Sequence, residues 1–283
     1  MLSLEPLAIG LVLLSALMHA GWNLIAKLGN DRLVAVALIK APNIFIAGAI
    51  LLLLPFPAPP SWPFLALSVV VNCLYFFFLI NAYRAGDLSL AYPVARGIAP
   101  LLVLGLSWIA AREIPDAAAV AGVGVVCVSL FALGLERRAT QRHYTTLCWA
   151  AGVGICIAVY TVGDGLGARA SGSPIAYVAA LNIVTGIAVC GFTWARRGAA
   201  FPAALRVHWR NGLLGGAMML AGYAIVVYAL TLAPMAHVAA LRESSVIFAA
   251  LLGAMVLKEP FGAKRVVASA GVALGIAILV LGR

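Results

Sequence analysis

Three basic residues lie inside long apolar stretches of this sequence: Lys40, Arg96 and Arg242. A charged side chain in a hydrocarbon environment costs at least about 2.5 kcal/mol, so each should face a partner or a cavity. Guanidinium groups match the geometry of carboxylates and phosphates. The two arginines therefore predict an anion-binding centre, and Lys40 would add a third positive charge to it.

Two acidic residues, Asp164 and Glu243, lie in similar apolar surroundings. In the alternative interpretation they neutralise the arginines and only hold helices together. Glu243 directly follows Arg242 and cannot share its helix face, but it could reach Arg96. Three basic residues against two acidic ones leave one positive charge, which a substrate carboxylate, phosphate or phosphonate would complete.

Asp164 and His19 are candidates for proton coupling, because a carboxylate and an imidazole can titrate in a cavity. Asp164 lies toward the end of its stretch, where exposure to solvent or pairing with Arg169 is an equal alternative. Lys40 has an alternative of its own, which is to extend its ammonium to the membrane interface.

Other polar and aromatic side chains in the apolar stretches could form the walls of a binding site or could make interhelical hydrogen bonds instead. The candidates for substrate binding are Trp22, Asn23, Tyr92 and Tyr160. No GxSxG or HExxH motif and no paired cysteines occur, so we expect no catalytic residue, no metal site and no cofactor.

The elements that position these residues must be membrane-spanning helices. The chain has 283 residues, of which 64% are hydrophobic and 10% charged, and its mean hydropathy of +1.09 excludes a water-soluble globule. The absence of long polar blocks argues against disorder and nucleic-acid binding. Ten stretches are long enough to span a bilayer: 7–28, 33–54, 62–83, 88–110, 116–135, 146–166, 174–194, 211–232, 235–257 and 262–281. Such a chain has no room for a soluble catalytic domain.

The net charge of +10 is distributed unevenly between the connections. The positive-inside rule places the more basic side in the cytoplasm, and both termini therefore outside. Only Arg112, Arg169 and Arg283 lie on the side of the termini. The basic side carries Lys27, Arg32, Arg84, Arg137, Arg138, Arg142, Arg196, Arg197, Arg206, Arg210, Lys258, Lys264 and Arg265.

Two segments repeat along the chain with the same spacing. Arg96 precedes the pair Arg112-Glu113 by sixteen residues, and Arg242 precedes Lys258-Glu259 by the same distance. This indicates two five-helix repeats, residues 1–140 and 141–283, of which the second enters the membrane from the opposite face. Inverted repeats with substrate bound between them are common in secondary transporters. Pro93 and Pro100 should interrupt the fourth helix around Arg96 and provide a hinge.

The sequence also resembles the drug/metabolite transporter superfamily, specifically its EamA-type ten-helix members. The residues that carry the resemblance are His19-Ala-Gly-Trp22-Asn23, Tyr92-Pro93-Val-Ala-Arg96-Gly97-Ile-Ala-Pro100, Leu232-Ala-Pro234 and Lys258-Glu259-Pro260. The resemblance implies an all-α integral membrane fold of two inverted five-helix repeats, located as a multi-pass protein in a bacterial-type inner membrane. It also implies transport of small metabolites. The first span has no deep acidic residue of the kind that small multidrug members use for cations, which argues against a cationic-drug pump.

We therefore expect a secondary transporter, not an enzyme, that moves a small anionic or zwitterionic metabolite by alternating access. An amino acid, an organic acid or a phosphate or phosphonate compound would fit. The alternative function is a lipid-carrier flippase or a membrane subunit without transport of its own. The expected partners are the substrate, the lipid bilayer and, as a coupling ion, protons. We expect no nucleic acid, and a monomer or homodimer.

Overall fold

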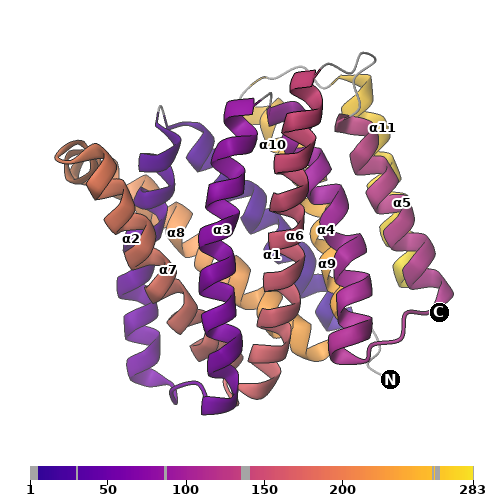
Figure 1. Cartoon of the computed structure of the whole chain (residues 1–283), viewed down its shortest axis with the longest axis horizontal. Coiled ribbons are helices and arrows are strands. Elements are labelled where there is room, and N and C mark those ends of the chain that lie inside the picture. The colour runs from indigo at the N-terminus through magenta and orange to yellow at the C-terminus, as the bar shows by residue number, and fades with distance from the viewer. Residues whose placement is uncertain are drawn as a thin grey trace.

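A computed structural model describes residues 6–29, 31–85, 88–134, 141–256, 258 and 262–282. In this part of the chain the structure is helical and has no strand (Figure 1). The helices are α1 (Pro6–Lys27), α2 (Arg32–Leu53), η1 (Pro59–Ser61), α3 (Trp62–Ala85), α4 (Leu88–Ala111), α5 (Ala117–Gly134), α6 (Gln141–Ala170), α7 (Pro174–Arg197), α8 (Ala200–Leu232), α9 (Met235–Arg242), α10 (Ser244–Val256) and α11 (Ala263–Leu281).

The expected all-α membrane fold is confirmed. Among the described residues, nine helical segments are long and apolar enough to cross a membrane, with α9 and α10 together forming one of them. The remaining predicted span corresponds to α5, whose apolar part (Ala117–Leu133) is shorter. At about 1.5 Å per residue, even this helix covers most of a hydrocarbon core.

The predicted interruption of the fourth helix is wrong. Despite Pro93 and Pro100, α4 continues as one helix from Leu88 to Ala111. Each proline removes a single backbone N–H, and a membrane helix tolerates this when its neighbours satisfy the freed carbonyl. The break occurs in the corresponding helix of the second half, where Glu243 separates α9 from α10.

The eighth span is also longer in the structure than the sequence predicts. Instead of beginning at residue 211, α8 begins at Ala200 and bends at His208, whose φ and ψ of −109° and 21° are not helical. The extension carries Arg206 and Arg210 but also the buried Phe201, so it is amphipathic. An amphipathic segment of this kind suits the membrane interface better than the hydrocarbon core.

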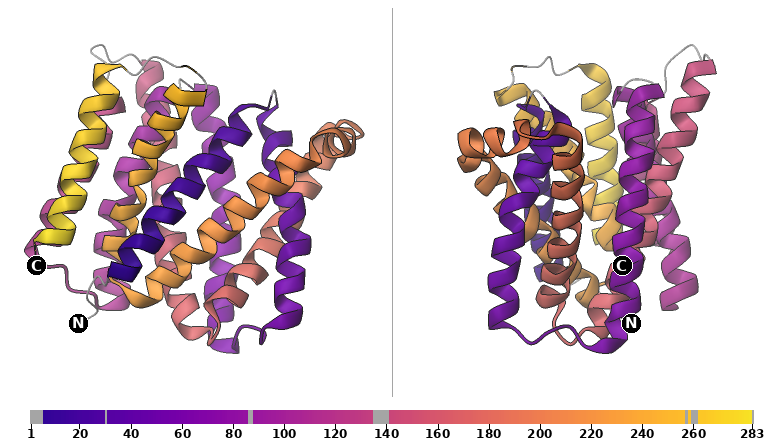
Figure 2. Two further views of the ribbon diagram at one scale, coloured as in Figure 1. Left: turned by 180° about the vertical axis from the view of Figure 1, so that it is seen from behind. Right: turned by 60° about the vertical axis from the view of Figure 1, so that its left-hand side comes forward.

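Successive spans run in opposite directions, so α1 begins and α11 ends at the same face of the bundle (Figures 1 and 2). We call this the terminal face. The connections that carry most of the basic residues lie at the opposite face, which we call the basic face. Arg137, Arg138 and Arg283 lie outside the described residues, as does the predicted repeat boundary at residue 140. Which face is cytoplasmic stays a prediction.

Helices of the two halves of the chain interleave instead of packing as separate bundles. α1 packs on α8 while α6 packs on α3, and α1 packs on α9 and α10 while α6 packs on α4. α2 packs on α7, and α5 packs on α11. If each helix in a pair is replaced by its counterpart five spans away in the chain, the result is again one of these pairs. This is the pattern expected of two related repeats. The interleaving brings residues of both halves into the middle of the molecule.

Candidate functional site

Arg96 and Glu243 form an ion pair in the interior of the bundle. Nε of Arg96 lies 2.9 Å from Oε2 of Glu243, and the two residues are 5% and 3% exposed. A terminal guanidinium nitrogen of Arg96 also donates to the Ser245 hydroxyl at 3.1 Å. A buried pair with additional hydrogen bonds offsets part of the cost of removing both charges from water. Arg96 is therefore fully engaged by the second half of the chain.

The break between α9 and α10 creates a further acceptor for Arg96. The backbone N–H of Glu243 bonds to the carbonyl of Ala240 in a tight turn, and the backbone carbonyl of Arg242 accepts from Arg96 at 3.3 Å. Discontinuous membrane helices commonly form substrate sites, because their unwound backbone offers polar groups at the midplane. The break thus places a backbone carbonyl and two side chains of opposite charge at one point.

The partners of Arg242 are uncharged, whereas Arg96 pairs with a carboxylate. The guanidinium carbon of Arg242 lies 6.0 Å from the centre of the Tyr223 ring on α8, which is within range of a cation–π interaction. Arg242 also reaches the hydroxyl of Tyr160 on α6. In the part of the chain that the structure describes, no ion pair engages Arg242, which remains partly exposed. Arg242 is therefore the more accessible cation of the two.

Asp164 contacts the hydroxyl of Tyr223, the same residue whose ring lies beside Arg242. Its carboxylate is fully buried and accepts hydrogen bonds from the hydroxyls of Tyr223 and Tyr177, the second at 2.8 Å. A polar chain therefore runs from Arg242 through Tyr223 and Asp164 to Tyr177. Buried carboxylates persist only with such donors, because otherwise their desolvation is too costly.

Other residues complete the centre. His19 on α1 faces both Arg96 and Arg242, and Tyr92 and Tyr160 lie near the same two side chains.

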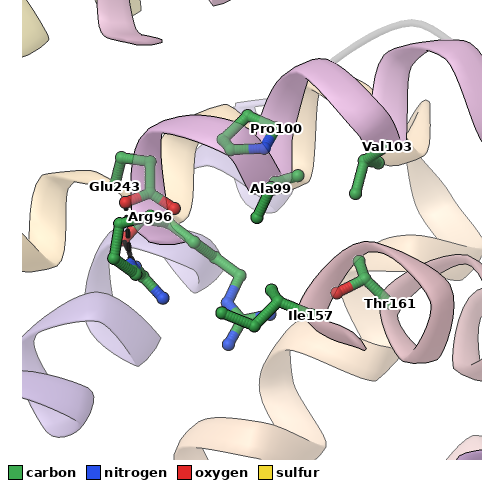
Figure 3. A pocket seen from close by; sticks show the side chains of 9 residues that line it. Arg96, Ala99, Pro100, Val103, Ile157, Thr161 and Glu243 are labelled. Carbon is green, nitrogen blue, oxygen red and sulfur yellow. Dashed lines mark hydrogen bonds and ion pairs between the residues drawn. The ribbon is translucent and has the colours of Figure 1, made fainter. Parts of the chain in front are cut away.

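A cavity of about 10 Å³ lies between α4, α6 and α9, enough for roughly one water molecule. Ile157 and Thr161 form one wall of it, opposite Ala99 and Val103 (Figure 3). We call Arg96, Arg242, Glu243, Asp164 and the residues around them the central site.

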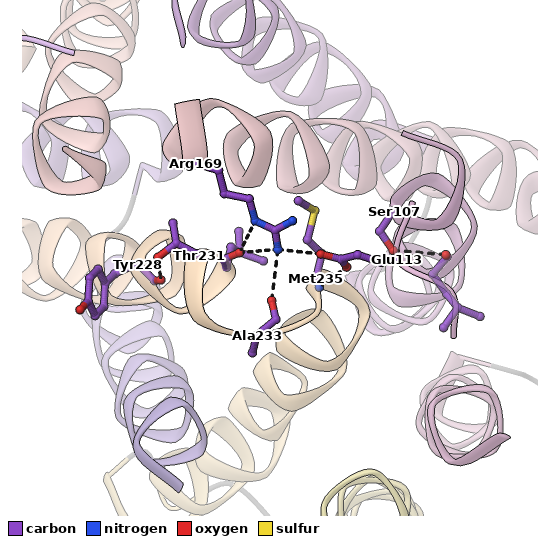
Figure 4. Close-up of polar contacts among 9 residues, drawn as sticks. Ser107, Glu113, Arg169, Tyr228, Thr231, Ala233 and Met235 are labelled. Carbon is purple, nitrogen blue, oxygen red and sulfur yellow. Dashed lines mark hydrogen bonds and ion pairs between the residues drawn. The ribbon is translucent and has the colours of Figure 1, made fainter. Parts of the chain in front are cut away.

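The suggestion that Asp164 is solvated or paired with Arg169 is wrong. Arg169 instead pairs with Glu113 at 2.6 Å and donates to the carbonyls of Leu230 and Ala233 (Figure 4). The other carboxylate oxygen of Glu113 accepts from the backbone N–H of Met235, the first residue of α9. This cluster ties α6 and the turn after α4 to the α8–α9 turn at the terminal face. Because Arg169 is engaged in this cluster, it does not pair with Asp164, whose carboxylate interacts with the tyrosines instead.

Lys40 does not join the central site. Its ammonium donates to Oδ1 of Asn182 at 3.2 Å and to Oγ1 of Thr185 at 3.3 Å, both on α7. Lys40 and Asn182 are 142 residues apart in the chain and contact each other where α2 packs on α7. The grouping of Lys40 with the arginines is wrong, because α2 faces α7 and α8 rather than α4.

Trp22 and Asn23 make local contacts on α1. The indole of Trp22 packs edge-on against His19 with ring centres 5.1 Å apart. The amide of Asn23 donates to the carbonyl of His19, one turn earlier, at 2.7 Å. These contacts orient the face of α1 that carries His19, but none of them reaches the arginines directly.

Two residues of the central site, Tyr177 and Ser245, are not among those predicted from the sequence. A single tyrosine in an apolar helix offers no signal of its own, and only the fold brings Tyr177 to Asp164. Ser245 gave a usable signal, because it follows Arg242 and Glu243 in a polar run that interrupts an apolar stretch. With Lys40 elsewhere, the central site contains two arginines and two acidic residues, whose formal charges balance.

Comparison with known proteins agrees with this architecture. Residues 144–281 match the sequence model of the EamA-like transporter family. This match lies within the second predicted repeat, and the resemblance drawn from the motifs is confirmed. Members of that family are membrane transporters.

The whole chain also matches solved structures. One of them, titled only as the crystal structure of a protein, has a TM-score of 0.77 at 19% sequence identity and covers 97% of this chain and 96% of its own. At this identity the match concerns the fold. A comparison with curated proteins gave no match.

Proposed function

The chain resembles EamA-like transporters in sequence and architecture, which indicates a membrane transporter of the drug/metabolite type, and we propose that it moves a small zwitterionic metabolite such as an amino acid. The observation that carries this proposal is the balance of charge in the central site. Arg96, Arg242, Glu243 and Asp164 come together from α4, α6 and the α9–α10 break. A neutral molecule with separated charges matches such a site better than a net anion does.

Arg242 is the residue that contacts the carboxylate of the substrate. Arg96 already has three acceptors, whereas Arg242 has an aromatic face and a hydroxyl and is more exposed. A carboxylate can form a bidentate pair with a guanidinium without displacing another carboxylate. The ammonium group of the substrate then lies toward Asp164 and the tyrosine hydroxyls.

The small size of the cavity supports alternating access. Its volume of about 10 Å³ is far below that of any metabolite, so the central site is closed in this conformation. A substrate can enter only if helices of the two halves move relative to one another, which is the motion that interleaved repeats permit. The ion pair between Arg96 and Glu243 keeps α4 and the α9–α10 break in register during this motion.

Arg242→Gln tests the proposal in proteoliposomes loaded with mixed amino acids. We expect uptake to fall at least about tenfold, because one charge-assisted pair with the substrate is worth about 1.5–3 kcal/mol. The matched control is Arg196→Gln, an exposed arginine at the basic face whose guanidinium lies over the Phe192 ring. Arg96→Gln is a poorer choice, since it leaves Glu243 buried without its partner.

Uptake by Arg242→Gln equal to that of the wild type would refute this assignment. A thermal-shift screen then separates the substrate classes, since a ligand that binds the folded state raises the unfolding midpoint. We expect amino acids to stabilise the wild type more than organic acids, phosphates or phosphonates do. Stabilisation only by lipid carriers would favour the flippase alternative instead.

A further inference from the structure

Lys40 is a partly buried cation outside the central site. It lies on α2 and points toward α7, where its ammonium donates to the side chains of Asn182 and Thr185. An ammonium has three N–H donors, and these contacts use two of them. Both acceptors are neutral, so they satisfy hydrogen bonds without compensating the charge.

No acidic residue in the described ranges compensates Lys40. Each of them has other partners: Asp31 binds Arg197, Glu113 binds Arg169, Asp116 caps α5, Asp164 binds tyrosines and Glu243 binds Arg96. An isolated charge inside a membrane protein is costly, and such residues usually mark an ion or substrate path. The positive charge of Lys40 is therefore not balanced by an acidic residue in the described ranges, whereas the basic and acidic residues of the central site balance one another.

A second polar group lies one helical turn from Lys40. Asn43 is fully buried, and neither its amide nitrogen nor its oxygen has a hydrogen-bond partner within the described residues. It faces α8, where a Cβ built on Gly216 would lie 2.8 Å from its oxygen. Leaving a buried amide unsatisfied costs about 1–3 kcal/mol. The interface of α2, α7 and α8 thus contains two residues with donors that the protein itself does not use.

We infer that this interface holds a second anion-binding site, formed by Lys40, Asn182, Thr185 and Asn43. Asn182 and Thr185 hold the ammonium through their oxygens, while the remaining N–H donor of Lys40 and the amide donors of Asn43 bind a small monovalent anion such as a halide or the carboxylate of a short organic acid. The site is separate from the central site and does not depend on which substrate the central site takes. Its occupant stabilises the packing of α2 against α7.

The test is thermal unfolding of the purified full-length protein in detergent. Chloride is titrated against gluconate at constant ionic strength, and sodium formate is titrated in a parallel series. We expect the wild-type unfolding midpoint to rise by a few degrees and to saturate. Lys40→Met should fold, since it removes a charge and leaves no carboxylate without a partner, but its midpoint should not respond to the anion.

Two further variants make the test specific. Lys264→Met removes an exposed lysine at the basic face and should respond to chloride like the wild type. Arg242→Gln should lose uptake yet keep the chloride response, so that a failure of this site is distinguished from a failure of the central site. A response to chloride alone identifies a halide site, and a response to formate as well identifies a carboxylate site. An equal response in Lys40→Met, or a wild type that responds to neither anion, would overturn the inference.

Discussion

At the scale of residues, the charged side chains within the membrane-spanning helices form two groups with different chemistry. In the central site, Arg96 is neutralised by Glu243, and Arg242 is connected through Tyr223 to Asp164. Lys40 has neutral partners on α7. Because Coulomb interactions are strong where water is excluded, a balanced centre can bind a zwitterion, while an unbalanced cation attracts an anion. The same types of residue therefore serve different ligands.

Asp164 belongs to this scale, and we predict that it couples transport to protons, with His19 as the second candidate. Asp164→Asn keeps a similar shape but cannot carry a negative charge. We expect this variant to exchange substrate across proteoliposomes while losing accumulation driven by a pH gradient. Tyr177→Phe is the control, since it removes one hydrogen bond to Asp164 and keeps the carboxylate. Gradient-driven accumulation at the wild-type level in Asp164→Asn would contradict the coupling role.

At the scale of elements, close helix packing and one helix break position the charged groups. Gly212 and Gly216 form a close contact of α8 with α2. A Cβ on these glycines would lie 2.6 Å and 2.7 Å from the backbone carbonyls of Leu38 and Ile39. This approach brings α8 against the segment of α2 that carries Lys40 and Asn43. The break at Glu243 likewise positions the charged groups of the central site.

Gly212→Ala tests the packing of α8 on α2. The added methyl group meets a backbone carbonyl that cannot move away, so the two helices must separate. We expect a loss of about 1–3 kcal/mol in unfolding free energy, measured as a fall of several degrees in the unfolding midpoint. Gly48→Ala on α2 is the matched control, because a Cβ there has no neighbour within 4 Å. That variant should be as stable as the wild type or slightly more stable.

At the scale of the whole molecule, the two predicted repeats share an unusual backbone conformation at one pair of corresponding positions. Arg112 and Lys258 both adopt a left-handed conformation with φ of 53°. They are separated by the same number of residues as Arg96 and Arg242, and each comes after the span that carries one of those arginines. A non-glycine residue with positive φ is uncommon, so its occurrence at both positions supports the predicted repeats. The division of the chain at residue 140 remains a prediction.

The orientation in the membrane is a prediction at this scale. The basic face carries most of the described lysines and arginines, so we expect it in the cytoplasm and the terminal face outside. A reporter that is active only outside the cytoplasm, fused after Arg283, should be active. The same reporter inserted at Gly198, between α7 and α8, should be inactive. The reverse pattern would show that both termini are cytoplasmic.

By itself, the sequence determined the all-helical membrane fold, the approximate limits of the spans and the buried charges. These follow from local composition, because a bilayer requires continuous apolar segments and makes each charge within them conspicuous. Only the tertiary structure decided which charges meet. It paired Arg96 with Glu243, connected Asp164 to tyrosines instead of Arg169, and placed Lys40 apart on α7. The physical reason is that side-chain partners depend on how helices from both halves interleave, and helix periodicity does not specify that arrangement.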